Sequence, residues 1–334
     1  LYTHDGNGTC NLYCGKKYIG DSIREYDFYK KIHSEEHKKD KIIQTFKEYI
    51  PKFNENETCR PINKEMDEKV KKDVDAYFTL SNANALVEDD PDKKVHNCDF
   101  KIGYKTGFKF DKGLYGDRRH KQIDKNASKS NQNGFRLEGS SLVKFLGEQG
   151  IKYQKYSGLS DNLLKFIMKL GKKAPQFKLY GLNPNFIFTK MFSQSTSGAL
   201  EDFKNKLETF ENDFIIESLK AFKDGERVVT LTGSSIFIVI GSNGIDFKLL
   251  DFAHPILFKG KKDNEEWENK EEKFGKEGKE HTIKYHQFQK AFYNYIAGLL
   301  AFVNSYLIWF NSEKEEEIKE IKNKLIDFSK DYFP

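Results

Sequence analysis

The sequence is poor in the residues that cross-link small folds. Its 334 residues include only four cysteines, at positions 10, 14, 59 and 98, too few and too scattered for a disulfide framework. Cys10 and Cys14 have no further Cys or His at the spacing of a zinc site. We therefore expect all four to be reduced thiols in a reducing compartment, which is cytoplasmic or nuclear.

No apolar run has the length of a membrane span. The longest, residues 295–310, is interrupted by Asn304 and Ser305 and is shorter than the ~20 residues that a span requires. We expect a buried core helix there. The sequence has no recognisable signal peptide, but it does not begin with Met, so organellar targeting by a segment ahead of it stays open.

Charge is abundant but not concentrated. Lys and Arg number 56 against 51 Asp and Glu, a net charge of +5, and the two signs are interleaved in the way typical of solvated helix faces and loops. Nucleic-acid binding requires a basic stripe, and RNA binding also requires a stacking motif. Neither is evident, so we expect no nucleic-acid partner. The 29 Phe and 17 Tyr instead supply an aromatic-rich core.

Hydrophobic periodicity predicts a mixed set of elements. A helix is predicted over 22–50, with Ser22 as N-cap, Glu25 at capping-box spacing and Pro51 at its end. Residues 226–254 read as a β-hairpin around the turn "GSNG", and 259–280 as a charged loop. Strands are also predicted within 9–20 and 74–83, and helices near 139–149, 159–171, 198–222, 283–311 and 313–329.

The stretch "VHNCDFKIGYKTGF", residues 95–108, places Asp99 two positions before Lys101. In a strand these side chains project to one face, whereas Phe100 and Ile102 project to the other, where a core can take them. Gly103 lets the backbone turn or approach a ligand closely. Two opposite charges on a rigid strand end can hold a polyanion and its counter-cation; an ordinary surface ion pair would give the same pattern.

The predicted hairpin carries a second polar group. Ser234 and Ser235 stand at the start of one strand, and Asp251 ends the next in "LLDFAH". Mg²⁺ takes one or two protein carboxylates plus phosphate and water oxygens, so a single Asp suffices, although a capped strand end has the same sequence. Residues 104–133 carry many cations and few aliphatics, which suits either an exposed loop or an anion-binding segment.

Together these pieces resemble the inositol polyphosphate kinase family. Its motif P-x-x-x-D-x-K-x-G is matched at Asp99, Lys101 and Gly103, and its Ser-Ser-Leu-Leu strand followed by I-D-F-A-H is similar to "GSSIFIVI" and "LLDFAH". Further similarities follow in the family's order over nearly the whole chain: "REYDFYKKI", "FKEYIPKF", "YFTLSNA", "GFRLEG" and "YIAGLLAFV".

The resemblance implies a two-lobed, protein-kinase-like α+β fold with antiparallel sheets and ATP between the lobes. Residues 1–90 would form the N-terminal lobe, and residues 91–334 the C-terminal lobe with the basic substrate segment 104–133 and the last helices. The implied activity is the ATP- and Mg²⁺-dependent phosphorylation of a soluble inositol polyphosphate. The moderate length of 104–133 is typical of the multikinase and hexakisphosphate-kinase branches.

The resemblance also implies a role for individual residues. Asp99 would lie at the nucleotide ribose, Lys101 at the substrate phosphates beside the transferred group, and Asp251 at the Mg²⁺, with Ser234 supporting the same site. Further implied residues are Lys16 or Lys17 at the ATP phosphates, Ser81 and Ala83 in the adenine hinge, and Lys105, Arg118, Arg119, Lys121, Lys125 and His254 at the substrate.

Some positions depart from the family pattern. The motif Pro is Val95, the hinge reads Ser81-Asn82-Ala83 in place of Glu-Asn-Leu or Glu-Asp-Val, and the first Gly of G-Y-x-x-G-L is Asn294. The substrate segment has "ASKSNQN" where the family has Ser-Thr-Ser. The alternative function is therefore that of a catalytically divergent member acting as a structural or binding subunit of a larger assembly.

Overall fold

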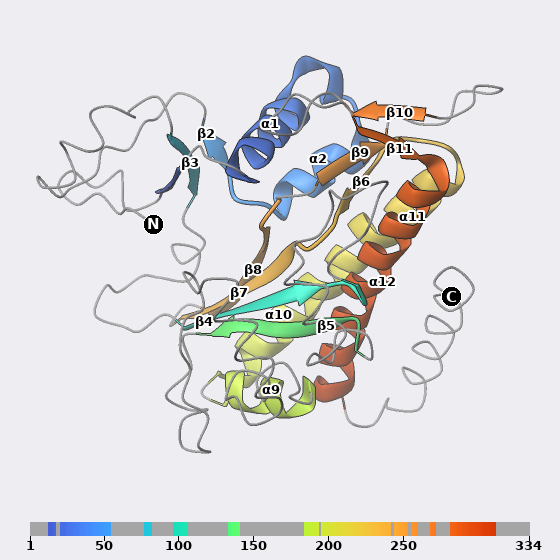
Figure 1. Cartoon of the computed structure of the whole chain (residues 1–334). Helices are drawn as coiled ribbons and strands as arrows, with labels where there is room; N and C mark the ends of the chain where they lie inside the picture. The colour runs from blue at the N-terminus through green and yellow to red at the C-terminus, as the bar shows by residue number, and fades with distance from the viewer. Residues whose placement is uncertain are drawn as a thin grey trace, which may run out of the picture.

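The protein has a mixed α+β fold, as predicted for its fold class, and the strands that the structure describes pair antiparallel throughout (Figure 1). The computed structural model describes residues 13–17, 21–54, 77–81, 96–105, 133–140, 184–193, 195–241, 244–252, 255–258, 268–271 and 281–311. The helices predicted near 159–171 and 313–329, and residues 141–149 of the one near 139–149, lie outside these ranges.

A four-stranded sheet forms the centre, in the order β5-β4-β7-β8. The hairpin of β7 and β8 turns where the sequence predicted, and the alternation along β4 is confirmed. Phe100 and Ile102 are buried in the core, and Asp99 and Lys101 occupy the opposite face. The strand bounds are Phe135–Ser140 for β5, His96–Ile102 for β4, Ser235–Gly241 for β7 and Gly244–Leu250 for β8.

Smaller sheets flank the central one. One of them has three strands in the order β1-β3-β2. The other two have two strands each, β6 with β9 and β10 with β11. Strand β10 corrects the expectation of a continuous loop over 259–280, because four of those residues pair with the strand that precedes the last described helix. The bounds are Tyr13–Lys17 for β1, Phe53–Asn54 for β2, Tyr77–Ser81 for β3, Val228–Leu231 for β6, Pro255–Phe258 for β9, Glu268–Glu271 for β10 and His281–Lys284 for β11.

Helices cover one face of the central sheet, where α10 contacts β8 and α12 contacts β4 and β5 (Figure 1). The helices predicted near 198–222 and 283–311 are confirmed. Thr196 caps α10 by accepting a hydrogen bond from the Ala199 amide. The bounds are Pro184–Met191 for α9, Ser197–Phe210 for α10, Glu211–Ile216 for the π-helical η6, Glu217–Lys223 for α11 and Tyr285–Phe310 for α12.

The single helix predicted over 22–50 is wrong, because the structure divides it into α1 (Asp21–His33), a 3-10 turn η2 (Glu35–His37) and α2 (Lys41–Glu48). Ser34 is extended, and its hydroxyl donates to the Lys31 carbonyl. The break turns His37 into the interior, within hydrogen-bond distance of Asp40. Because α1 begins at Asp21, Ser22 lies inside the helix.

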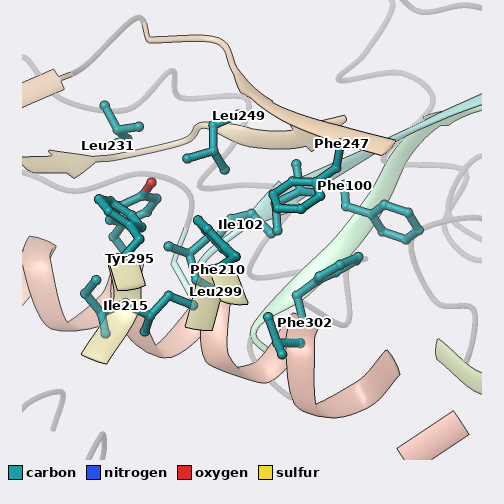
Figure 2. Packing of buried hydrophobic residues seen from close by; sticks show 14 of the residues in the cluster. Phe100, Ile102, Phe210, Ile215, Leu231, Phe247, Leu249, Tyr295, Leu299 and Phe302 are labelled. Atoms are coloured by element: carbon teal, nitrogen blue, oxygen red, sulfur yellow. The ribbon is translucent and has the colours of Figure 1, made fainter. Parts of the chain in front are cut away.

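One aromatic-rich cluster holds these elements together. It includes residues of α1 and α2, and α2 contacts β6, η6 and α11, so these N-terminal helices pack on the part of the chain predicted as the second lobe. The boundary near residue 90 stays a prediction. Figure 2 shows side chains from β4, β8 and α12 converging, among them Phe100, Ile102, Phe247, Leu249, Tyr295, Leu299 and Phe302.

Helix α12 is the core helix that the sequence predicted. In the described part of the chain it is the one helix long and apolar enough to cross a membrane, over Phe288–Phe310, and 83% of its most apolar window is buried inside the protein. Such burial is typical of the central helix of a globular domain.

A glycine junction brings α12 against the ends of two strands. A Cβ on Gly298 would lie 2.5 Å from the Gly103 nitrogen and 2.9 Å from the Gly134 carbonyl oxygen. Gly103 adopts a φ of +108° and donates its amide to the Gly134 oxygen at 2.8 Å. Close backbone packing therefore requires glycine at both 103 and 298, and at Gly103 this adds to the turn that the sequence predicted.

This packing predicts opposite effects for two Gly-to-Ala changes. Gly298→Ala should lower the free energy of unfolding by roughly 1–3 kcal/mol or more, because the new methyl meets backbone atoms that cannot move aside. Gly198→Ala in α10 should raise it by up to about 1 kcal/mol, since nothing lies within 4 Å of its Cβ position. Urea unfolding of both variants measures the contrast, and equal stabilities would contradict the close packing.

Candidate functional site

The outer face of the central sheet carries a row of polar side chains. Lys101 on β4 is paired with Arg136 on β5 and with Ser235 on β7, and directly opposed residues share a face. Because side chains alternate along β4, Asp99 lies on this face too. The β4–β5 register shifts beside Asp99 and leaves Glu138 unpaired in the ladder, but its Oε2 accepts a hydrogen bond from Arg136 Nε at 2.9 Å and so stays beside this row. Three strands thus contribute to one polar surface, while their intervening residues fill the core.

The Lys101 ammonium joins the two motifs. Its Nζ donates to Asp251 Oδ2 at 2.9 Å and to Ser235 Oγ at 3.3 Å. Lys101 is only 6% exposed, and this burial acts to lower its pKa; the Asp251, Asp99 and Glu138 carboxylates outweigh it and raise the pKa above its ordinary value. The amine is therefore charged, and it depends on these carboxylates.

Asp251 follows β8 in a strained conformation. Its φ is +64°, and it is the only non-glycine residue with positive φ in the described ranges. Asp and Asn tolerate this left-handed region better than most residues, although it still costs free energy. The Asp251 side chain remains 47% exposed while its Oδ2 holds Lys101. A carboxylate at this position contacts both the buried lysine and solvent.

Asp99 has an unusual ionisation. Its pKa is raised to about 6, chiefly by burial and also by the Asp251 and Glu138 charges, although Lys101 and a hydrogen bond from Ser235 act to lower it. Its Oδ1 is shielded from solvent and has no hydrogen-bond partner among the described residues. A shielded carboxylate oxygen without a donor indicates a position that a ligand's donor group or a cation would satisfy.

The charges on this face do not balance. Asp99, Glu138 and Asp251 are set against Lys101 and Arg136, whose Nε donates to Glu138 at 2.9 Å. An excess of oxygen donors suits a divalent cation. No group of three or more His, Cys, Asp or Glu residues that could hold a metal occurs in the described part of the chain. Mg²⁺ fits this donor set, because it takes one or two carboxylates and completes its shell with phosphate and water oxygens.

Helix α1 brings Tyr29 close enough to the site for the Asp251 charge to act on it. Tyr29 is fully buried, and its pKa lies well above the ordinary value because of burial and because of the nearby Glu25 and Asp251 carboxylates. Glu25 is itself 2% exposed. The sequence singled out Glu25 only as a capping residue, and its burial near Tyr29 could not be read from the spacing alone.

The structure brings Asp99, Lys101 and Asp251 close together, while the ligand roles that the resemblance implies for them stay predictions. The Ser234 hydroxyl is turned away, donating to the Leu231 carbonyl at 3.2 Å, and the neighbouring Ser235 hydroxyl contacts Lys101 instead. Lys105 lies where the chain leaves β4, Lys16 and Lys17 belong to β1, and Ser81 ends β3. Ala83, Arg118, Arg119, Lys121, Lys125 and His254 lie outside the described residues.

Sequence reasoning missed Arg136 and Glu138. Both lie in "GFRLEG", which was noted only as a similarity to the family, yet they show the same two-residue spacing of opposite charges as Asp99 and Lys101. That repeated spacing was the available signal. The register that places β5 beside β4 was the missing information.

The raised pKa of Asp99 predicts a pH-dependent stability. Its folded pKa of about 6 exceeds the ordinary 3.8, so the folded state binds the proton more tightly. The stability that the folded state gains from this tighter proton binding is fully present below about pH 3.8 and is lost as the pH rises through about 6. Asp99→Asn should therefore gain stability relative to the unmutated protein between pH 4 and pH 7. Urea unfolding at several pH values measures this difference, and parallel profiles would contradict it.

No family model matches the sequence, and no curated protein matches it. Among solved structures, the chain is similar to inositol phosphate multikinase Ipk2 from S. cerevisiae, solved with ADP and Mn²⁺, at 15% identity and a TM-score of 0.43, over 89% of this chain and 98% of that chain. It is also similar to an inositol phosphate multikinase studied by protein engineering, at 15% identity and a TM-score of 0.36, over 85% and 98% of the two chains.

Proposed function

We propose that the protein transfers a phosphoryl group from ATP to a soluble inositol polyphosphate. The observation that carries the proposal is the 2.9 Å contact between Lys101 Nζ and Asp251 Oδ2. It joins two motifs that lie 150 residues apart and that resemble the two conserved motifs of inositol polyphosphate kinases. A chance similarity of short sequences would not require their charged residues to meet.

Lys101 and Asp251 have complementary tasks in this proposal. The Lys101 ammonium, kept charged inside the protein, attracts the phosphate that is transferred. Asp251 offers its half-exposed carboxylate to Mg²⁺, and the bound metal supplies charge neutralisation for the phosphates. Ser235 holds both Lys101 and Asp99 in place by hydrogen bonds. Phosphoryl transfer requires mainly such positioning and electrostatic stabilisation.

The nucleotide would lie between the central sheet and the β1-β3-β2 sheet. Asp99, whose Oδ1 lacks a donor, accepts a hydrogen bond from the ribose hydroxyls. Ser81 ends the strand that pairs with β1, and with Ala83 it forms the adenine hinge. Lys16 or Lys17 on β1 reaches the ATP phosphates.

The substrate would lie beyond Lys101, along the segment that leaves β4. An inositol polyphosphate is a small and densely charged anion, so it requires several cations in addition to the metal. We assign this clamp to Lys105, and to Arg118, Arg119, Lys121, Lys125 and His254 by resemblance.

Replacing the metal-binding carboxylate tests the proposal. Asp251→Asn should lower kcat at least ~10²-fold, because the metal no longer offsets charge in the transition state. Asn tolerates the left-handed backbone at this position, and the Asp99 and Glu138 carboxylates still favour the charged form of Lys101, so the fold should persist. The matched control is Asp246→Asn on the same hairpin. Asp246 Oδ2 forms an ion pair with Lys206 Nζ, at a distance of 3.4 Å, and takes no part in the site. Turnover with a panel of inositol phosphates, ATP and Mg²⁺ measures both variants.

Ligand-dependent stability separates an enzyme from a structural subunit. The ion pair of Lys101 with Asp251 also suits a subunit without activity, in which the two charges satisfy one another. For a kinase, ATP with Mg²⁺ at 100 times its dissociation constant should stabilise the unmutated protein by roughly 2.7 kcal/mol. Thermal unfolding with and without the nucleotide measures the shift. An unchanged melting temperature under saturating ATP and Mg²⁺, together with no turnover, would favour the structural role.

A further inference from the structure

Asn294 on α12 makes a two-sided contact with the backbone of Lys105. The Lys105 amide donates to Asn294 Oδ1 at 2.8 Å, and Asn294 Nδ2 donates to the Lys105 carbonyl at 2.9 Å. Asn294 is only 1% exposed. A buried carboxamide costs free energy unless it is hydrogen-bonded, and here its oxygen and its nitrogen both find a partner in the same residue.

The contact lies at the glycine junction. Gly103 leaves so little room that a Cβ there would come within 2.5 Å of Asn294 Nδ2. Gly298, one helical turn after Asn294, packs on the backbone of Gly103 and on the oxygen of Gly134. One face of α12 therefore holds the chain both where it leaves β4 and where it returns to β5.

This arrangement fixes Lys105 relative to the site. Lys101 is held by Asp251 on the sheet, and four residues later the Lys105 backbone is held by Asn294. The side chain of Lys105 is exposed, whereas its peptide groups are bound to the core helix. A cation whose backbone is fixed loses less conformational freedom when it binds an anion than a cation on an unrestrained loop.

We propose that Asn294 is a positioning residue for the polyanionic substrate, acting through Lys105. The inference rests on the proposed function, since it requires a phosphorylated ligand beside Lys101. It assigns no substrate contact to Asn294 itself, because the carboxamide is buried and both of its ends are used by Lys105. Removing the carboxamide should weaken substrate binding by releasing Lys105 and should leave nucleotide binding unchanged.

A double-mutant cycle with inositol hexakisphosphate as the anion probe tests this proposal. Dissociation constants are measured by calorimetry for the unmutated protein, Asn294→Ala, Lys105→Ala and the double variant. Each single change should weaken binding roughly threefold or more, and the double variant should bind no worse than Lys105→Ala alone. The affinity for ATP with Mg²⁺ should be the same in all four proteins.

The matched control is Asn304→Ala. Asn304 is a second buried asparagine of α12, and its Nδ2 has no hydrogen-bond partner among the described residues. This change should alter stability without altering the affinity for inositol hexakisphosphate. Hydrogen exchange at the Lys105 amide gives an independent readout, which should accelerate in Asn294→Ala and stay unchanged in Asn304→Ala.

The other outcomes overturn the inference in distinguishable ways. Additive losses in the cycle would show that Asn294 does not act through Lys105. Equal losses for ATP and inositol hexakisphosphate, or the same loss in Asn304→Ala, would show general destabilisation. Unchanged exchange at Lys105 would show that the two-sided contact is absent. If the unmutated protein itself fails to bind inositol hexakisphosphate, the substrate class of the proposed function fails, and the inference falls with it.

Discussion

The candidate site depends on keeping a positive charge inside the protein at Lys101. Burial alone would drive the proton off this amine, so the surrounding carboxylates must lie close enough to outweigh the loss of water. Asp251 meets that need from the end of β8 and adopts a left-handed backbone there. Asp99 shares the task, and its own raised pKa reflects how little water it retains. The register of β4, β7 and β8 is therefore tied to electrostatics as well as to packing.

The same sheet separates two environments. Its inner face is aromatic and closed by α10 and α12, and its outer face carries the charged row. Alternation along β4 makes the division possible, since Phe100 and Ile102 fix the strand in the core while Asp99 and Lys101 face away. A shift of one residue in register would bury the charges and expose the aromatics. Core packing thus determines which side chains the site receives.

Local patterns predicted what local physics controls. The two-residue period placed Asp99 and Lys101 on one face, the "GSNG" turn located the hairpin, and the apolar run located α12. Tertiary contacts decided the rest. The helix predicted over 22–50 is interrupted between α1 and α2, where the buried His37 lies beside Asp40 and beside Arg227, 190 residues away in the sequence. Ser235 rather than Ser234 contacts Lys101, because the turn before β7 directs the Ser234 hydroxyl to the Leu231 carbonyl. The spacing in the sequence does not specify the direction of that turn.

Gly103 shows how one residue can serve both the core and the site. The sequence alone explained it by a turn or by the approach of a ligand, whereas the structure shows a helix backbone pressed against it. The positive φ of Gly103 turns the chain away from β4, and the absence of a side chain admits Gly298 and the carboxamide of Asn294. Lys101 and Lys105 lie on either side of this glycine. The course of the backbone between the two lysines is consequently fixed by a packing contact in the core. The proposed effect of Asn294 on Lys105 would therefore pass through the backbone rather than through any charged group.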